Sequence, residues 1–85
     1  MFSIEFSGAA AKFLKKADKQ LAKRIIDKIE ELAEDPFPQD VKRVINQKEK
    51  IFRIRVGDNR IQYSVLFDKQ LLIISDIDKR ESAYQ

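Results

Sequence analysis

The sequence predicts a small α+β domain, in which two helices pack on one face of an antiparallel sheet. The first half of the chain carries apolar residues at helical spacing, and the second half alternates apolar and polar residues between turn-forming segments. Consecutive hairpins give antiparallel pairing, so the expected order is β-α-α-β-β-β. A chain of 85 residues suffices for one domain, which we expect to span residues 1–85.

The N-terminal half predicts one short strand and two helices. Phe2, Ile4 and Phe6 alternate with polar residues, which is the spacing of a strand. Ser7 and Asp18 are suitable N-caps for the two helices that follow. The apolar stripes of these helices recur every three or four residues: Ala10, Phe13, Leu14 and Ala17, then Leu21, Ala22, Ile25, Ile29 and Leu32. The second helix should end at Asp35-Pro36, because proline lacks an amide hydrogen and restricts the residue before it.

The C-terminal half predicts three strands, at about 51–56, 60–67 and 71–78. Gly57-Asp58-Asn59 and Asp68-Lys69-Gln70 have the composition of the two hairpin turns. Residues 36–40 should form a linker, and Val41, Val44 and Ile45 should anchor a loop or a single helical turn. The polar residues 46–50 should form a further turn.

Composition excludes several classes of chemistry. Without cysteine there is no disulfide or thiolate metal site, and without histidine the commonest metal ligand and general base are missing. Asp76 and Asp78 share a strand face but form a lone pair beside basic residues, so we interpret them as the polar end of an edge strand and expect no metal or cofactor. The apolar runs are far shorter than the roughly 20 residues of a membrane span, and the N-terminus lacks the pattern of a signal peptide. We therefore expect a soluble protein of the cytoplasm that does not bind membranes.

Positive charge is concentrated in the middle of the chain. Between Lys42 and Arg60 there are seven Lys or Arg and two acidic residues, a net charge of +5, whereas the rest of the chain sums to −2. This asymmetry fits either a contact with a polyanion or an ordinary solvated surface. The alternation in 52–56 places Arg53 and Arg55 on one face, and Arg60 lies just past the turn, where it can join them. Guanidinium groups fit phosphate oxygens bidentately, so these three residues are the candidate phosphate site.

Two tyrosines allow different interpretations. Tyr63 shares its strand face with Ile61, Val65 and Phe67, which favours packing in or near the core. Tyr84 lies in a polar C-terminal segment and could cover the fold, stack on a base or exchange a proton.

Residues 52–63, Phe-Arg-Ile-Arg-Val-Gly-Asp-Asn-Arg-Ile-Gln-Tyr, and the terminal Lys-Arg-Glu-Ser-Ala-Tyr of 79–84 resemble the RelE/ParE superfamily of toxin–antitoxin toxins. The compact RelE type of archaea and bacteria looks most similar. The Asp35-Pro36 break and the stretch 41–44 also fit, so the resemblance covers essentially the whole chain in order and length.

The resemblance implies a RelE-like toxin that is a ribosome-dependent endoribonuclease, or mRNA interferase. Such toxins enter the ribosomal A site and cleave mRNA by attack of a 2′-hydroxyl on the adjacent phosphate, which inhibits translation. The reaction requires no metal when cations stabilise the transition state, and RNA supplies its own nucleophile. The implied partners are the ribosome, mRNA and a RelB-like antitoxin encoded alongside the toxin.

Matched by position to this family, five residues are candidates for catalysis. Arg53 and Arg55 would clamp the scissile backbone, and Arg60 and Arg80 would bind the phosphate and its transition-state charge. Tyr84 would stack on a base or take part in proton transfer. The lysines expected to contact RNA are Lys48, Lys50 and Lys79.

The chain departs from the family pattern at two places. Well-studied nucleases of this family often carry lysines where this chain has Arg53 and Arg55, and many relatives have histidine where it has Lys79. Arginine does not exchange a proton at physiological pH. The candidates for general base are Lys79, Tyr84 or Glu81, unless electrostatic stabilisation acts alone.

Two other functions remain open at this stage. A ParE-like protein of the same fold would inhibit DNA gyrase by binding it, without chemistry of its own, and a degenerate relative would act only as a binding partner. The cationic hairpin favours RNA, because a gyrase inhibitor has no need for arginines that converge on one phosphate.

Overall fold

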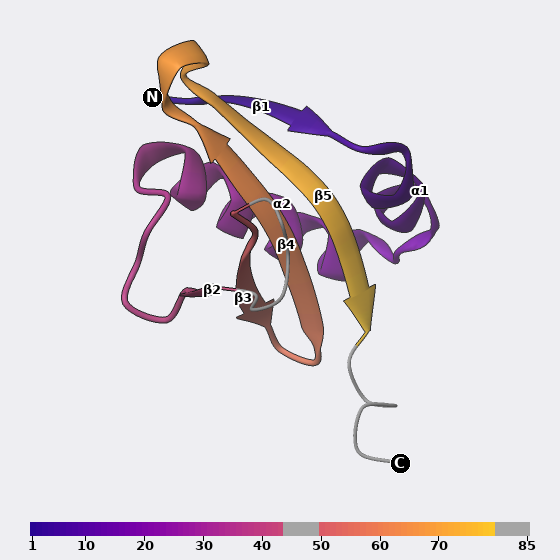
Figure 1. The fold of residues 1–85 in the computed structure, drawn as a ribbon. Coiled ribbons are helices and arrows are strands. Elements are labelled where there is room, and N and C mark those ends of the chain that lie inside the picture. Colours follow the sequence, from indigo (N-terminus) through magenta and orange to yellow (C-terminus); the bar gives the residue numbers. More distant parts are fainter. Residues whose placement is uncertain (44–49, 80–85) are drawn as a thin grey trace.

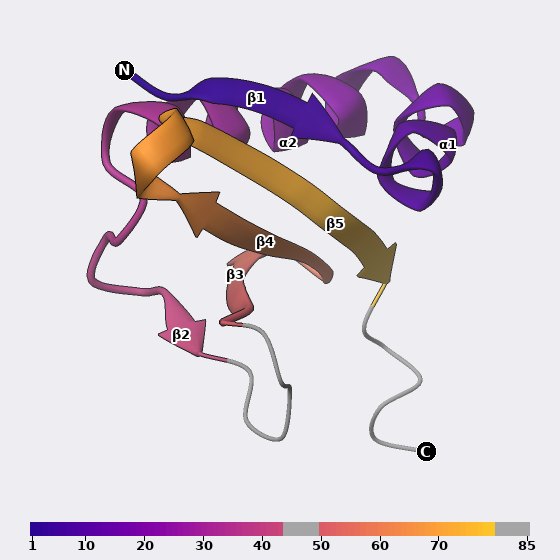
Figure 2. The ribbon, with the colours of Figure 1, turned by 45° about the horizontal axis from the view of Figure 1, so that its top comes forward.

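A five-stranded sheet with two helices on one face makes up the described part of the chain (Figure 1). The structure is a computed structural model that describes residues 1–43 and 50–79. The strands are β1 (Ser3–Phe6), β2 (Lys42–Arg43), β3 (Phe52–Val56), β4 (Asn59–Leu66) and β5 (Leu71–Lys79). They are arranged in the order β1-β5-β4-β3-β2. The predicted α+β class, with both helices on one face, is confirmed (Figure 2).

The helices α1 (Gly8–Lys16) and α2 (Lys19–Glu34) begin at the predicted caps. The Asp18 carboxylate accepts the Leu21 amide at 2.9 Å. The Ser7 hydroxyl accepts the Ala10 amide at 3.1 Å and donates to the Ser75 carbonyl at 2.8 Å, so the cap also ties α1 to β5. Asp35, directly before Pro36, is the C-cap of α2. Local sequence thus sets both ends of α2, as expected.

Strand directions differ from the expectation at one edge of the sheet. The strands β2 to β5 pair antiparallel, but β1 pairs parallel with β5, in the register Ser3 to Leu71 through Phe6 to Ile74. The expected purely antiparallel sheet is therefore corrected to a mixed sheet. The physical reason is the long connection between these two strands: a parallel pair requires a crossover, and both helices lie within it.

The segment 42–43 corrects a second expectation. Lys42 and Arg43 form the short edge strand β2 on β3, where a loop or helical turn was expected. A two-residue strand has no periodicity of its own, and it becomes recognisable only through its pairing with Phe52 and Arg53. Val41 packs against the core as an anchor, whereas Val44, Ile45 and residues 46–49 of the expected turn lie outside the described residues.

Both predicted hairpins are present. Gly57 and Asp58 form a two-residue turn between β3 and β4, and Gly57 adopts φ +60°, a conformation that glycine reaches at little cost. Phe67–Lys69 form a single 3₁₀ turn before β5, and Gln70 adopts φ 51°. The strand boundaries lie within one residue of those predicted, because turn residues and alternation mark them in the sequence.

The core lies between the helices and the sheet. Ile25, Ile29 and Leu32 of α2 are buried against residues of β3, β4 and β5 such as Ile54 and Ile74. Apolar residues of this helix and alternate residues of these strands therefore form one continuous cluster, as their periodicities predict.

Tyr63 is fully buried in this core, which confirms its predicted packing role. Its hydroxyl donates to the Pro36 carbonyl at 2.5 Å, which links β4 to the segment after α2. Burial, and to a smaller extent the nearby carboxylates of Asp35 and Asp40, raise the pKa of Tyr63 far above its usual value.

Over the described ranges, no helix has the length and apolar character needed to cross a bilayer.

Candidate functional site

The face of the sheet opposite the helices carries the predicted arginines. Phe52, Ile54 and Val56 face the core, so the alternating Arg53 and Arg55 face away from the helices. The register places Arg55 opposite Arg60 and Arg53 opposite Gln62, and directly opposed residues of a sheet share a face. The prediction that the three arginines occupy one surface is therefore supported by the pairing of β3 with β4. We call this surface the open face.

Arg60 is held by a carboxylate on the neighbouring strand. Its Nε lies 3.0 Å from Asp78 Oδ1 and its Nη2 lies 3.1 Å from Asp78 Oδ2, a fork-to-fork pair across β4 and β5. The two side chains are 23% and 36% exposed, so water screens the pair only in part. Asp78 lies near the polar end of β5, as interpreted, but β5 lies between β1 and β4, so the expected edge strand is corrected to an inner strand. The Asp78 carboxylate also fixes the direction of the Arg60 guanidinium, a role that the sequence did not indicate.

The row Arg55–Arg60–Asp78 contains two cations directly opposite each other. Like charges at such positions destabilise a sheet, and the Asp78 carboxylate offsets one of them. The pairing of Arg55 with Arg60 is therefore unfavourable for the stability of the sheet, and an uncharged residue at either position would be more stable. Such local conflicts are typical of functional sites.

Lys42 is a further cation of this surface, and sequence reasoning assigned it no role. It pairs with Arg53 across β2 and β3, so a row of Lys42, Arg53 and Gln62 runs beside the row of Arg55 and Arg60. A hollow of about 190 Å³ lies here, lined by Asp40, Lys42, Arg53, Ile54 and Arg55. In the sequence, only the cluster of positive charge between residues 42 and 60 indicated a role for Lys42. The pairing of Lys42 with Arg53 could be found only from the tertiary structure.

A larger, mostly apolar hollow continues along β4. It has a volume of about 550 Å³, and its lining includes Ile51, Leu66 and Ile73 together with the hydroxyl-bearing Ser64. Ser64 and Leu66 follow Gln62 at strand spacing, so this hollow adjoins the arginine rows on the same face. Lys50, one of the lysines predicted to contact RNA, lines it. The open face thus combines a cationic end with an apolar end.

The remaining predicted residues divide into two groups. Lys79 is exposed at the end of β5 and pairs with Asn59, which itself pairs with Val56. Val56 faces the helices, so Lys79 occupies a register position on the helix side of the sheet. Arg55 and Arg60 lie on the other side, the open face. Arg80, Tyr84 and Lys48 lie outside the described residues, as does the candidate base Glu81. Their predicted roles therefore remain predictions.

Comparison with known proteins gives a consistent result. Residues 4–84 match the model of the family described as ParE toxin of type II toxin-antitoxin system, parDE. The curated RelE1 protein of Methanocaldococcus jannaschii is 34% identical over 87 residues, which cover 99% of this chain and 96% of that protein.

Solved structures give the same fold. The archaeal RelE–RelB complex from Pyrococcus horikoshii OT3 superposes with a TM-score of 0.80 at 23% identity, covering 93% of this chain and 94% of the other. The RelB–RelE antitoxin–toxin complex from Methanococcus jannaschii gives a TM-score of 0.70 at 27% identity, with 95% of each chain covered.

Proposed function

The chain belongs to the RelE/ParE superfamily and is the toxin of a RelBE-type toxin–antitoxin system, and from this we propose that it cleaves mRNA in the ribosomal A site. The observation that carries the proposal is the pair of cationic rows on the open face, with Arg53, Arg55 and Arg60 on adjoining strands. A gyrase inhibitor that acts by binding would not need cations directly opposed at a cost in stability.

The proposed reaction is an internal transfer of the phosphate. The 2′-oxygen attacks the adjacent phosphorus, the bond to the 5′-oxygen breaks, and a 2′,3′-cyclic phosphate remains on the upstream fragment. The 2′-hydroxyl proton passes to a base and the leaving 5′-oxygen acquires a proton. Negative charge accumulates on the non-bridging oxygens as phosphorus becomes five-coordinate, and fixed guanidinium groups stabilise it.

Each open-face residue has a distinct role in this proposal. Arg60, oriented by Asp78, and Arg55 opposite it would hold the scissile phosphate. Arg53 would bind the neighbouring backbone, with Lys42 beside it. Arginine is always protonated at neutral pH, so these residues supply charge and position, and the base must be another group. Tyr84 and Arg80 are proposed, by family position, as the stacking or proton-transfer residue and a second phosphate ligand.

The apolar hollow beside the arginines suits a nucleobase. Its lining by Ile51, Leu66 and Ile73 offers a nonpolar surface at the side of the phosphate site, and Lys50 can contact the backbone there. RNA recognition on sheets commonly combines backbone contacts by cations with bases laid on the sheet surface.

The test is a cleavage assay with ribosomes programmed with mRNA and an empty A site, in which primer extension locates any cut. The wild type should cut inside the A-site codon, and Arg53→Ala, Arg60→Ala and Arg80→Ala should each reduce the rate by about 100-fold, a typical cost of losing one transition-state donor. The matched control is Arg43→Ala, because Arg43 lies on the same sheet but pairs with Phe52, whose side chain contacts the core. Full activity in all three variants would refute the proposed site.

The second candidate function is inhibition of DNA gyrase, and the observation that favours it is the match to the family model of ParE toxins. A ParE-like inhibitor would stop DNA replication without cutting mRNA. Expression in cells separates the two, since loss of protein synthesis with cleaved mRNA supports the nuclease, and loss of replication with intact mRNA supports gyrase inhibition.

We further propose a RelB-like antitoxin as the partner, because RelE proteins of Pyrococcus horikoshii and Methanococcus jannaschii are solved in complex with RelB. A ribosomal target also implies a cytoplasmic location. Co-expression with the product of the adjacent gene should abolish toxicity, and a stable complex should co-purify.

A further inference from the structure

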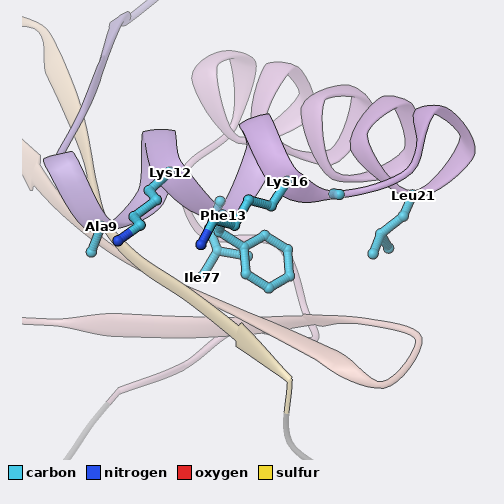
Figure 3. A pocket seen from close by; sticks show the side chains of 7 residues that line it. Ala9, Lys12, Phe13, Lys16, Leu21 and Ile77 are labelled. Carbon is cyan, nitrogen blue, oxygen red and sulfur yellow. The ribbon is translucent and has the colours of Figure 1, made fainter.

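A β-bulge in β5 turns a carboxylate onto the open face. Ile74 faces the core, so strict alternation would turn Asp76 toward the core as well. The pairing with β4 is interrupted here: Ile74 and Asp76 both have partners on β4, and Ser75 is the extra residue between them. Beyond the bulge, Ile77 lies on the helix side, where it lines an apolar cleft with Phe13 of α1 (Figure 3). Asp76, next to Ile77 in the strand, therefore points to the open face.

The bulge is held by hydrogen bonds on both sides of β5. The Ser75 hydroxyl donates to the Gln62 carbonyl at 3.1 Å, and the Ser7 hydroxyl donates to the Ser75 carbonyl at 2.8 Å. Bulges are common next to active sites, where they redirect a side chain. These two bonds fix the backbone beside Asp76, so its carboxylate projects from a defined position.

Asp76 differs from Asp78 in the residue that it faces. Asp78 lies opposite Arg60, and both of its oxygens accept N–H groups of the guanidinium. Asp76 lies opposite Gln62, which is neutral, and it is half-buried. Over the described ranges 1–43 and 50–79, Asp76 takes part in no hydrogen bond or ion pair. A half-buried carboxylate without a partner is unfavourable for stability, and its oxygens are available to accept a proton.

We propose that Asp76 is the general base of the proposed cleavage. One of its carboxylate oxygens takes the proton of the 2′-hydroxyl as the 2′-oxygen forms its bond to phosphorus. The bond to the 5′-oxygen breaks, the 5′-oxygen takes a proton from another group, and Asp76 afterwards releases its proton to water. The inference rests on the proposed nuclease function and adds the base that the arginines of the open face cannot supply.

The spacing of the sheet places Asp76 at a suitable distance from the proposed phosphate position. That position lies in the row of Arg55, Arg60 and Asp78, and Asp76 belongs to the adjoining row of the same face. Adjoining rows are about 6.8 Å apart, because every second residue of a strand shares a face. An attacking oxygen lies about 3 Å from phosphorus and a base about 3 Å from that oxygen, which together span about 6 Å. A nucleotide whose phosphate is bound by the arginines can therefore present its 2′-hydroxyl to Asp76.

The other candidate bases are less well placed. Lys79 occupies a register position on the helix side of the sheet. Asp40 lines the cationic hollow, but its side chain is 61% exposed and its Oδ2 lies 3.8 Å from Lys28 Nζ. Glu81 and Tyr84 lie outside the described residues, so the experiment includes a variant of each.

The experiment measures the single-turnover rate of cleavage on ribosomes programmed with mRNA and an empty A site. Asp76→Asn should cut about 100-fold more slowly or worse, the range for a lost general base, and should bind the programmed ribosome at least as tightly as the wild type. The sign of the effect is informative, because a carboxylate that merely lies near a phosphate repels it, and its neutralisation would then speed cleavage. The matched control is Asp58→Asn, which makes the same change in charge at the exposed turn between β3 and β4 and should keep the wild-type rate.

A second variant tests the chemistry separately from the fold, which thermal melting of each variant verifies. Asp76→Ala removes the carboxylate and leaves space that formate, a small carboxylate, can enter. Sodium formate should raise the cleavage rate of Asp76→Ala by about tenfold or more, whereas sodium chloride at the same concentration should not. A residue with only a structural role would give no response to formate.

A modified substrate distinguishes a base from an acid. Sulfur in place of the 5′-oxygen gives a leaving group that needs no proton, so this substrate restores cleavage when a general acid has been lost, but not when a base has been lost. Asp76→Asn should therefore remain slow on it. Recovery of the wild-type rate would make Asp76 the acid and would overturn the inference.

The remaining outcomes also count against the inference. Wild-type or faster cleavage by Asp76→Asn would exclude Asp76 as the base, and loss of cleavage in Glu81→Gln or Tyr84→Phe alone would assign the proton to that residue. Slow cleavage by Asp76→Ala that formate does not restore would make Asp76 a structural residue. If the wild type cuts no mRNA, the nuclease proposal fails and the inference fails with it. If the wild type and Asp76→Asn cut equally well, the nuclease proposal stands and only the inference fails.

Discussion

Replacing Tyr63 with phenylalanine should lower the free energy of unfolding by about 1–2 kcal/mol at neutral pH. The tyrosine hydroxyl is buried and donates to the Pro36 carbonyl, and Pro36 is itself buried. The substitution removes about 1 kcal/mol of net hydrogen-bond energy and leaves a buried carbonyl without its donor, while the ring and its packing remain. Chemical denaturation followed by circular dichroism measures this difference.

The same substitution should change how stability depends on pH. Burial raises the pKa of Tyr63 in the folded protein, whereas the unfolded chain titrates at about 10. The stabilisation is therefore complete below about pH 10 and is lost above it, because only the unfolded state releases the proton there. The loss amounts to about 1.4 kcal/mol by about pH 11, which removes most of the wild-type advantage over Tyr63→Phe.

Comparison of the two proteins isolates this effect, since they differ only by the hydroxyl group of residue 63. The difference in free energy of unfolding between wild type and Tyr63→Phe should be constant from pH 6 to about pH 9 and then shrink. Absorbance titration should find at least one of the two tyrosines protonated at about pH 11 in the folded protein, and both ionised in denaturant. Parallel stability profiles up to about pH 11 would show that Tyr63 ionises freely, and the reasoning about its burial would be refuted.

Two further predictions concern the open face and the hairpin that carries it. A double-mutant cycle with Arg60→Gln and Asp78→Asn should give a coupling energy of about 1 kcal/mol that decreases with added salt, as for a partly exposed bidentate pair. Asp76→Asn, opposite Gln62, should show no such coupling with Arg60→Gln, and a coupling near zero for Asp78 would contradict the pairing seen here. Gly57→Ala should cost about 1 kcal/mol in thermal unfolding, because φ is +60° and the added methyl group would lie 3.2 Å from the Arg24 guanidinium. A neutral Gly57→Ala would indicate a turn that relaxes without strain.

The cationic rows illustrate how a sheet can assemble a site from residues that are unremarkable separately. Arg53 and Arg55 reach the open face by alternation along β3, and Arg60 joins them by the two-residue turn at Gly57. Asp78 comes from β5 and fixes the direction of Arg60. The rigidity of the surface comes from the backbone ladders, so the proposed site needs no long loops to position its charges.

Most of the secondary structure follows from local patterns in the sequence. Ser7 and Asp18 cap the helices, Pro36 limits the second one, and the alternation around Ile54 marks a strand. These features depend on contacts between residues close in the chain, and backbone sterics and side-chain spacing therefore determine them. Alternation also determined that Arg53 and Arg55 share a face, because the side-chain period of a strand is two.

Tertiary structure decided everything that depends on which strands become neighbours. The parallel pairing of β1 with β5, the existence of β2, the partnership of Asp78 with Arg60 and the alignment of Lys42 with Arg53 each join residues distant in the sequence. Neither the direction nor the register of such a pair is encoded in either strand alone. The register is set when the apolar faces of β3, β4 and β5 are buried together under α2. A shift of one residue in the pairing would point the arginines of the open face into the core.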